Sequence, residues 1–292
     1  MHKSGFVNIV GNPNVGKSTL MNVLVGEKLS IITSKSQTTR HRIMGIVNGE
    51  DYQIVYSDTP GVLKPNYKLQ ESMLNFSTGA LKDADVLLYV TDTVETIDKN
   101  IDFIEKVRKS QIPTLLVINK IDLTTPEMLE ILVEKWQKFL PDAHIFPASA
   151  LNKFNLENIF KEIINTLPEG EPYYPKDTLT DKPLRFFASE IIREKILLYY
   201  QKEIPYSCEV VIEEYQEGAQ MDRIRAIIYV ARDSQKGIII GHKGTMLKKV
   251  GTAARKDLEI FLAKKVFLET YVKVNENWRD NDKSLRRYGY SE

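Results

Sequence analysis

The chain has 292 residues, of which 42% are hydrophobic and 27% are charged, and its formal net charge at pH 7 is +1. A length about twice that of a common domain favours two domains over one, and this composition excludes a disordered or fibrous protein. No stretch approaches the roughly 18 consecutive apolar residues that span a bilayer. A single cysteine, Cys208, excludes an internal disulfide. The N-terminus also lacks a signal-peptide core, so we expect a reducing cytoplasm.

The near-neutral total charge hides an uneven distribution. Residues 1–180 carry 19 basic and 22 acidic side chains, a net charge of −3, whereas residues 181–292 carry 21 and 17, a net charge of +4. Within the second part, residues 231–265 hold 9 basic and 3 acidic side chains, a local excess of +6. Domains that bind nucleic acid are usually basic, so the total argues against such a partner while the local excess keeps it open.

The first 170 residues alternate short β-branched runs with longer helical patterns. We predict strands at 6–10, 53–57, 86–91, 114–118 and 144–148, with helices between them. Several of these runs are apolar at successive positions, as expected for strands that helices cover on both faces. The pattern predicts an α/β domain with a mostly parallel sheet.

A proline-rich segment follows and the order of elements then changes. Residues 168–183 are expected to form a linker, because prolines and glycine disfavour helices and strands. Beyond it we predict a helix at 186–200, strands at 210–214 and 223–230, a short helix up to residue 240, a helix at about 245–263 and a strand at 266–274. The chain is therefore divided into a domain at 1–167, a linker and a smaller α+β domain of αββααβ order at 184–292.

A phosphate-binding motif follows the first predicted strand. Gly11-Asn12-Pro13-Asn14-Val15-Gly16-Lys17-Ser18 matches G-x-x-x-x-G-K-[ST] and precedes a helical run from Thr19 to Gly26. The glycines let backbone N–H groups approach phosphate oxygens, and the helix N-terminus favours negative charge. Lys17 supplies a positive charge at the β- and γ-phosphates, and Ser18 offers a hydroxyl to Mg²⁺. The motif predicts a nucleoside triphosphate site without choosing the base.

Three later segments indicate guanine and a second magnesium ligand. Asp58-Thr59-Pro60-Gly61 ends a predicted strand, where Asp58 can hold Mg²⁺ through water and Gly61 can present its N–H to a γ-phosphate. In Asn119-Lys120-Ile121-Asp122, Asp122 can accept hydrogen bonds from N1–H and the 2-amino group of guanine, which adenine lacks. Ser149-Ala150 can place a backbone N–H on the guanine O6. Each segment alone is common, but all of them follow predicted strands, where open α/β sheets bind ligands.

These segments resemble the translation-factor-type GTPases. The resemblance implies that Asn119 holds the site together, that Lys120 lies along the base, and that a threonine in residues 30–42 completes the Mg²⁺ shell. Thr38 and Thr39 are both candidates, and we favour Thr39. The magnesium ligands would be Ser18, Thr39 and Asp58, and the switch or catalytic residues Lys17, Thr38, Thr39 and Gly61. The predicted nucleotide-binding residues are Gly11, Asn12, Pro13, Asn14, Val15, Gly16, Lys17, Ser18, Thr19, Asp58, Thr59, Pro60, Gly61, Val62, Asn119, Lys120, Ile121, Asp122, Ser149 and Ala150.

One position departs from the Ras-like pattern. Val62 stands where a water-orienting glutamine would, and a valine cannot position water by hydrogen bonding. We therefore expect slow intrinsic hydrolysis, with water positioned by backbone groups, a bound cation or a partner. In related GTPases with a hydrophobic residue here, an asparagine at the position of Asn14 helps to hold K⁺, and we extend that hypothesis to this chain.

The second domain carries a Gly241-His242-Lys243-Gly244 turn between two predicted helices. In an αββααβ array this turn resembles that of a type II KH domain, whose loop clamps four nucleotides of single-stranded RNA. A helix connection beside a solvated lysine face is the plainer interpretation. The predicted RNA-binding residues are Gly237, Ile238, Ile239, Ile240, Gly241, His242, Lys243, Gly244, Lys248, Lys249 and Arg255.

Single residues elsewhere receive plainer interpretations. His41 and His242 are expected at the surface, and Cys208 is expected to pack in a strand. Trp278 has two alternative predicted roles: it stacks on a base, or it packs the last strand against the sheet.

Taken over nearly its whole length, the chain closely resembles the bacterial Era family. The residues that carry this resemblance are those of 37–42, Ile191-Ile192-Arg193-Glu194-Lys195 and 237–244. It implies a monomeric cytoplasmic GTPase that acts in small-subunit ribosome assembly, binds the 3′ end of 16S ribosomal RNA and contacts the membrane peripherally. A metabolic phosphotransferase and a non-hydrolysing RNA-binding module are the alternatives.

Overall fold

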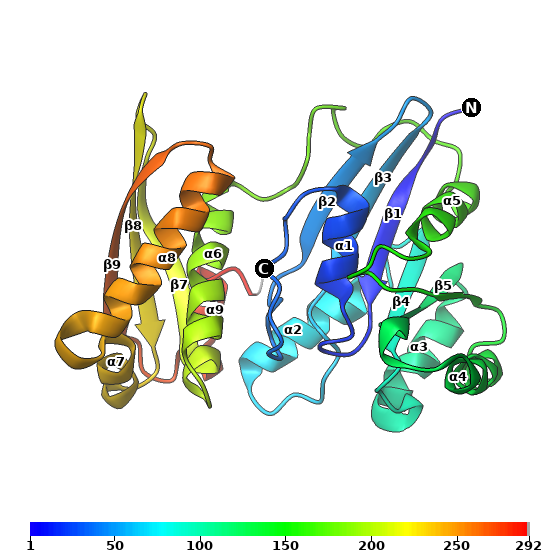
Figure 1. Ribbon diagram of the computed structural model, residues 1–292, viewed down its shortest axis with the longest axis horizontal. Helices are drawn as coiled ribbons and strands as arrows, with labels where there is room; N and C mark the ends of the chain where they lie inside the picture. Colours follow the sequence, from blue (N-terminus) through cyan, green and yellow to red (C-terminus); the bar gives the residue numbers. More distant parts are fainter. Residues whose placement is uncertain (291–292) are drawn as a thin grey trace. The chain divides into compact units, whose positions relative to one another are not determined.

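The computed structural model describes residues 1–290, which divide into two compact units (Figure 1). The first unit comprises Met1–Pro65 and Gln70–Asp181. The second comprises Asn66–Leu69 and the residues from Lys182 onward. Each unit has its own sheet and its own hydrophobic core.

The first unit is built on a six-stranded sheet of order β2-β3-β1-β4-β5-β6. Its strands are β1 (Lys3–Val10), β2 (Ile43–Asn48), β3 (Tyr52–Asp58), β4 (Val86–Asp92), β5 (Thr114–Asn119) and β6 (His144–Pro147). All neighbours are parallel except β2, which pairs antiparallel with β3. The predicted mostly parallel sheet is confirmed. β2 lay outside the predicted strands, because an edge strand interrupted by Gly45 lacks the long apolar run of a central strand.

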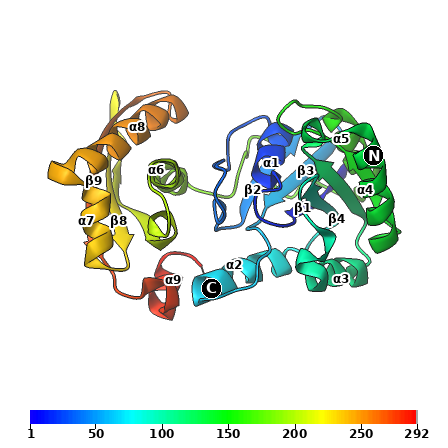
Figure 2. The same ribbon diagram turned by 60° about the horizontal axis from the view of Figure 1, so that its bottom comes forward.

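Helices cover both faces of this sheet. They are α1 (Lys17–Val25), α2 (Lys68–Gly79), α3 (Ile101–Ser110), α4 (Pro126–Phe139) and α5 (Leu156–Thr166). Figure 2 shows α1 and α5 on one face of the strands and α2 and α3 on the other. All seven residues of β4 are buried, which explains why its sequence is apolar at successive positions.

The proline-rich segment forms no helix and no long strand, yet hydrogen bonds join it to the sheet of the first unit. Near its start, the N–H of Ser4 donates to the carbonyl of Pro168 at 3.1 Å. Farther along, the side chain of Gln53 exchanges two hydrogen bonds with the backbone of Tyr174. At its end, the N–H of Ile46 donates to the carbonyl of Leu179 at 2.8 Å. The segment is therefore laid along strands β1, β3 and β2 rather than extended into solvent.

The second unit has the predicted αββααβ order, and its type of fold is confirmed. Its elements are α6 (Leu184–Tyr199), β7 (Cys208–Gln216), β8 (Met221–Val230), α7 (Asp233–Ile240), α8 (Thr245–Phe261), β9 (Lys265–Val274) and α9 (Asp282–Arg287). In the sheet β7-β8-β9, β8 is antiparallel to β7 and parallel to β9. The core joins α6, α7 and α8 to one sheet face, with Ile196, Ile228, Ile239 and Val250 fully buried.

Short 3-10 helices complete the chain, and the last of them holds Trp278. They are η1 (Ile97–Asn100), η2 (Ile121–Leu123), η3 (Ile204–Ser207), η4 (His242–Gly244) and η5 (Trp278–Asp280). Trp278 is fully buried, and its indole N–H donates to the carbonyl of Ser207 at 2.9 Å. Of its two predicted roles, the structure assigns it to sealing the sheet. Cys208 is also buried, as expected.

Candidate functional site

The predicted phosphate and base segments meet at one edge of the first sheet. Strands β1, β3, β4, β5 and β6 are parallel, so their carboxyl ends lie together, and Ile9 is level with Asp58 as Asp92 is with Asn119. Open α/β sheets bind ligands at this edge. The sequence motifs 11–18, 58–61, 119–122 and 149–150 all start at or just beyond these strand ends.

The loop before α1 needs glycine at its first position. Gly11 has a φ of 143°, and a Cβ there would lie 2.1 Å from the carbonyl oxygen of Val90. Only glycine fits such an approach without moving the backbone. Helix α1 then begins at Lys17, so its N-terminal N–H groups face the loop.

Lys17 is buried in this loop. Its ammonium donates to the carbonyl of Asn12 at 2.7 Å, and only 6% of the residue is exposed. Burial lowers the pKa of Lys17 to about 8, against the opposing attraction of Asp58 and Glu95. Such a lysine is stabilised as a cation when anionic phosphate oxygens arrive.

A cluster of oxygens lies beside Lys17. The hydroxyl of Ser18 donates to Oδ2 of Asp58 at 2.7 Å and lies 2.8 Å from the hydroxyl of Thr39, which itself lies 3.2 Å from Oδ2. The other oxygen of Asp58 is buried without a hydrogen-bond partner among the residues described. Burial raises the pKa of Asp58, while Lys17 and the hydroxyls lower it. Mg²⁺ prefers oxygen ligands, so this donor set fits the predicted ion.

The two candidate threonines have different surroundings. The hydroxyl of Thr39 faces Ser18 and Asp58, whereas that of Thr38 donates to the carbonyl of Lys35 at 2.6 Å and lies 2.7 Å from the hydroxyl of Thr33. The geometry therefore favours Thr39 as the ligand. No group of three or more His, Cys, Asp or Glu side chains suited to a metal occurs in the described part of the chain.

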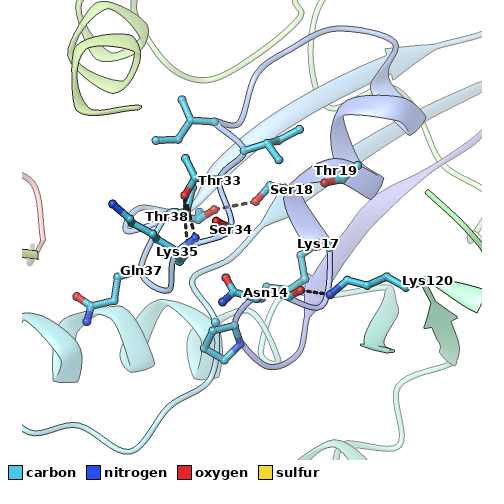
Figure 3. A pocket seen from close by; sticks show the side chains of 16 residues that line it. Asn14, Lys17, Ser18, Thr19, Thr33, Ser34, Lys35, Gln37, Thr38 and Lys120 are labelled. Atoms are coloured by element: carbon cyan, nitrogen blue, oxygen red, sulfur yellow. Dashed lines mark hydrogen bonds between the residues drawn. The ribbon is translucent and has the colours of Figure 1, made fainter. Parts of the chain in front are cut away.

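Together these segments enclose an open pocket of about 380 Å³. Figure 3 shows the residues around it, with Lys17 and Ser18 on α1 and with Thr33, Ser34, Lys35, Gln37 and Thr38 on the loop that precedes β2. The lining residues are Pro13, Asn14, Gly16, Lys17, Ser18, Thr19, Ile31, Ile32, Thr33, Ser34, Lys35, Gln37, Thr38, Thr39, Gly61 and Lys120.

At the base end, Asn119 connects the phosphate loop to the loop after β6. Its amide donates to the carbonyl of Val15 at 2.8 Å, and its side-chain oxygen accepts the N–H of Ala150 at 2.9 Å. The ammonium of Lys120 donates to the carbonyl of Asn14 at 2.6 Å (Figure 3). These contacts join three sequence motifs into one rigid rim.

Asp122 is oriented in the same rim. Its Oδ1 accepts the hydroxyl hydrogen of Ser149 at 2.6 Å. A carboxylate held in this way by a neighbouring loop is fixed in direction, as recognition of a planar base requires.

The sequence interpretation missed two residues that support the nucleotide site, Asp92 and Asn100. Asp92, at the end of β4, accepts a hydrogen bond from Lys120 at 2.6 Å and from the N–H groups of Val94 and Glu95. Its place at a strand end was a usable signal, because the other parallel strands also lead into the site. Asn100, whose contacts are described below, carried no sequence signal.

His41 differs from its expected place. The residue is half-buried rather than exposed, and its ring centroid lies 6.2 Å from that of Phe76. The loop before β2 packs against α2 here, which a single polar residue in a sequence does not reveal.

In the second unit, the predicted loop connects α7 to α8. Gly241 has a φ of 71°, and a Cβ there would come within 2.8 Å of the Met246 side chain. His242 and Lys243 are exposed, as are Lys248, Lys249 and Arg255 on α8. The loop therefore presents basic side chains beside the N-terminus of a 17-residue helix.

The three isoleucines before this loop face different ways. Ile238 is 49% exposed, whereas Ile239 is fully buried and Ile240 packs against the core. The Ile239 side chain is therefore turned into the core, and a contact of Ile239 with RNA stays a prediction. In a helix, successive side chains point about 100° apart, so a run of three cannot share one face.

A second hollow, of about 550 Å³, lies between α6 and α8. Lys248, Lys249 and Lys256 line it, and the ammonium of Lys249 lies 4.5 Å from the centroid of the Tyr199 ring. This places the basic face of α8 beside an aromatic ring, a combination suited to nucleic acid.

Both halves of the chain match known families. The model of the 50S ribosome-binding GTPase family matches residues 6–120, and that of the KH domain family matches residues 203–279. Fold and site thus define a P-loop GTPase domain followed by a KH domain. A curated relative, GTPase Era from Syntrophus aciditrophicus (strain SB), is 45% identical over 295 residues, covering 100% of this chain and 96% of the relative. The chain belongs to the Era family of GTPases.

Solved structures of Era are also similar to this chain over its whole length. A structure of Era in complex with MgGDPNP and nucleotides 1506–1542 of 16S ribosomal RNA has a TM-score of 0.96 at 40% identity, covering 100% of both chains. An Aquifex aeolicus Era variant bound to GDP and AlF4⁻ has a TM-score of 0.95 at 40% identity, covering 99% of this chain and 100% of the other. Membership of this family sets aside the phosphotransferase and non-hydrolysing interpretations. None of the helices described here is long and apolar enough to cross a membrane.

Proposed function

We propose that this GTPase is a GTP-gated switch that binds the 3′ segment of 16S ribosomal RNA and acts in assembly of the small ribosomal subunit. The observation that carries the proposal is the similarity over the full chain to a protein solved with MgGDPNP and nucleotides 1506–1542 of that RNA. The nucleotide pocket and the exposed loop 241–244 of this chain supply the two sites that such a switch needs.

At the nucleotide pocket, Ser18, Thr39 and Asp58 would hold Mg²⁺, which neutralises charge on the phosphates. Lys17 and the N–H groups at the start of α1 bind the phosphate oxygens, and Asp122 reads the guanine edge. Support comes from the close approach of Ser18, Thr39 and Asp58 and from the partnerless oxygen of Asp58.

The gating step would start at Thr39, because a bound γ-phosphate and its Mg²⁺ would stabilise the position of Thr39 beside Ser18 and Asp58. β2 begins shortly after Thr39, and its residues Met44 and Ile46 hydrogen-bond to Asp181, Thr180 and Leu179. A change in the order of this loop thus reaches the chain segment that leads into the KH domain.

At the KH domain, the loop 241–244, the exposed Ile238 and the lysines of α8 bind a single RNA strand. The backbone of the loop approaches phosphates, and Lys243, Lys248, Lys249 and Arg255 supply charge. The exposure of these basic side chains supports this role.

Binding of a labelled RNA that matches the 3′ segment of 16S RNA tests the switch. We expect its affinity to differ between the GDP-bound protein and the protein with a non-hydrolysable GTP analogue. Equal affinities would contradict gating, and an affinity no better than for a scrambled RNA would contradict the RNA assignment.

Hydrolysis without a partner is expected to be slow. The Val62 side chain is 3% exposed and packs in the core cluster that contains Val10 and Phe103, so it offers nothing to water. Asn14 lines the pocket (Figure 3) and would help to hold K⁺ near the phosphates. Single-turnover hydrolysis in potassium against sodium tests this, since equal rates would contradict a potassium role.

A cytoplasmic location, peripheral membrane contact and a monomeric state stay predictions from the family resemblance. Cell fractionation and light scattering of the purified protein check them.

A further inference from the structure

Val62 is held from three directions. Its N–H donates to the carbonyl of Gly11 at 3.0 Å, and its own carbonyl accepts a hydrogen bond from Nδ2 of Asn100 at 3.1 Å. Its side chain is buried in the core cluster described above. The residue directly after Gly61 is therefore an anchor of the 58–62 segment, not merely a missing glutamine.

Asn100 also reaches the phosphate loop. The same Nδ2 donates to Oδ1 of Asn12, whose backbone carbonyl accepts the hydrogen bond from Lys17. One side-chain amide, 88 positions from Asn12 and 38 from Val62 in the chain, thus joins the phosphate loop to the residue after Gly61.

The position of Asn100 makes this use of its amide unusual. It is the N-cap residue of α3, where an asparagine side chain commonly accepts a hydrogen bond from the first turn of the helix. Here the side chain makes no such cap bond. The amide faces the nucleotide site instead, and Phe103 and Ile104 on the next turn anchor the helix in the core.

Gly61 lies directly against the phosphate loop in this arrangement. A Cβ at Gly61 would come 2.6 Å from the Cα of Pro13. Val62 cannot orient water, and the backbone N–H of Gly61 is one of the groups expected to act at the γ-phosphate. Such a donor stabilises a transition state only if its position is fixed before the reaction.

We propose that Asn100 is a positioning residue for GTP hydrolysis, which fixes Val62, and with it the neighbouring Gly61, against the phosphate loop through its bonds to the Val62 carbonyl and to Asn12. This inference rests on the proposed GTPase function and, within it, on the role that the sequence predicts for the Gly61 N–H at the γ-phosphate. Asn100 itself touches neither the phosphates nor the attacking water in this scheme.

Two substitutions separate this role from helix capping. Asn100→Asp keeps the shape and the capping ability of the residue but cannot donate to Val62 or Asn12, whereas Asn100→Ala removes both functions. We expect each to lower single-turnover hydrolysis by about tenfold or more, as misplacement of a catalytic group does. GDP affinity and melting temperature should stay at the wild-type values.

Asn158→Ala is the matched control, because Asn158 also donates its amide to an asparagine oxygen, that of Asn155, on the exposed side of α5. It should hydrolyse GTP like the wild type. Wild-type hydrolysis by both Asn100 variants would overturn the inference. So would a parallel fall of hydrolysis, GDP affinity and melting temperature in both, since that indicates a general structural role.

Gly61→Ala distinguishes failure of the inference from failure of the proposed function. If Gly61→Ala is slow while both Asn100 variants are normal, only the inference is overturned. If Gly61→Ala hydrolyses GTP at the wild-type rate, the proposed role of Gly61 is wrong and the inference falls with it.

Discussion

Two glycine-bracketed loops precede helices in this chain, and they differ in burial. The loop 11–16 is joined through Asn12 to Asn100 and through Val15 to Asn119, and Lys17, directly after the loop, is buried. The loop 241–244 has hydrogen bonds between near neighbours, such as Gly244 to Gly241, and its lysine is exposed. This difference fits the proposal that the first loop binds one compact ligand in a fixed pose and the second binds a flexible strand of phosphates.

This difference predicts different sensitivities. A buried charge acts at low dielectric, so its loss should be severe and nearly independent of salt. Exposed charges are screened, so their loss should be milder and salt-dependent. Four experiments test this contrast.

The largest effect is expected for Lys17→Ala. Removing one partner of a buried charge pair costs about 2–5 kcal/mol, so GDP and GTP affinity should fall by about 30-fold to several thousand-fold. Titration calorimetry with GDP and GTP measures this loss of affinity. RNA binding by the nucleotide-free protein should be unchanged, and an equal loss there would contradict separate sites.

The second largest effect is expected for Asp122→Asn. The amide can no longer accept both guanine hydrogens, and a polar group left unmatched under the bound base costs about 1–3 kcal/mol, or about 5- to 150-fold in GTP affinity. The same amide can donate to the 2-oxo group of xanthine. Competition between GTP and xanthosine triphosphate checks this, and an unchanged preference would refute base reading by Asp122.

Replacing His242 and Lys243 with aspartates should weaken RNA binding about tenfold at physiological salt and flatten its salt dependence. Nucleotide affinity should not change. Replacing Lys135 and Lys138, two exposed lysines of α4, with aspartates is the control for added negative charge. If this control weakens RNA binding equally, the loop has no special role.

The smallest effect is a pH dependence of GDP affinity. The pKa of Lys17 in the unliganded protein is about 8, and bound phosphates raise it. Above that pH, binding must therefore take up a proton, and affinity should fall as pH rises, by about threefold between pH 7.5 and 8.5. Calorimetry in buffers of different ionisation enthalpy detects this uptake. A flat profile would show that Lys17 stays charged throughout.

The sequence predicted that the proposed phosphate and base segments follow strands whose ends converge, because this placement depends on local geometry and sheet topology. A glycine such as Gly11 is required wherever the backbone must approach a neighbouring strand, and polar residues at the ends of parallel strands converge by the rules of sheet topology. The alternation of elements likewise predicted both domain folds. Within the second domain, however, the apolar run 238–240 concealed that Ile239 belongs to the core.

Which of two neighbouring threonines faces the magnesium site depends on the tertiary structure. Thr38 and Thr39 are chemically equal in sequence, and only packing turned Thr39 toward Asp58. The prolines at 168–181 predicted a segment without helix or strand. Its attachment to β1, β2 and β3, however, depends on hydrogen bonds to groups of these strands that the sequence does not reveal.

By itself, then, the sequence determined that this chain is a GTPase with a KH domain, because both glycine-bracketed loops are short motifs whose backbone geometry is encoded locally. Tertiary structure alone decided how those loops are supported. The bonds of Asn100 to Asn12 and Val62 span 88 and 38 positions. Such contacts follow from how helices pack on the sheet, and no local pattern encodes them.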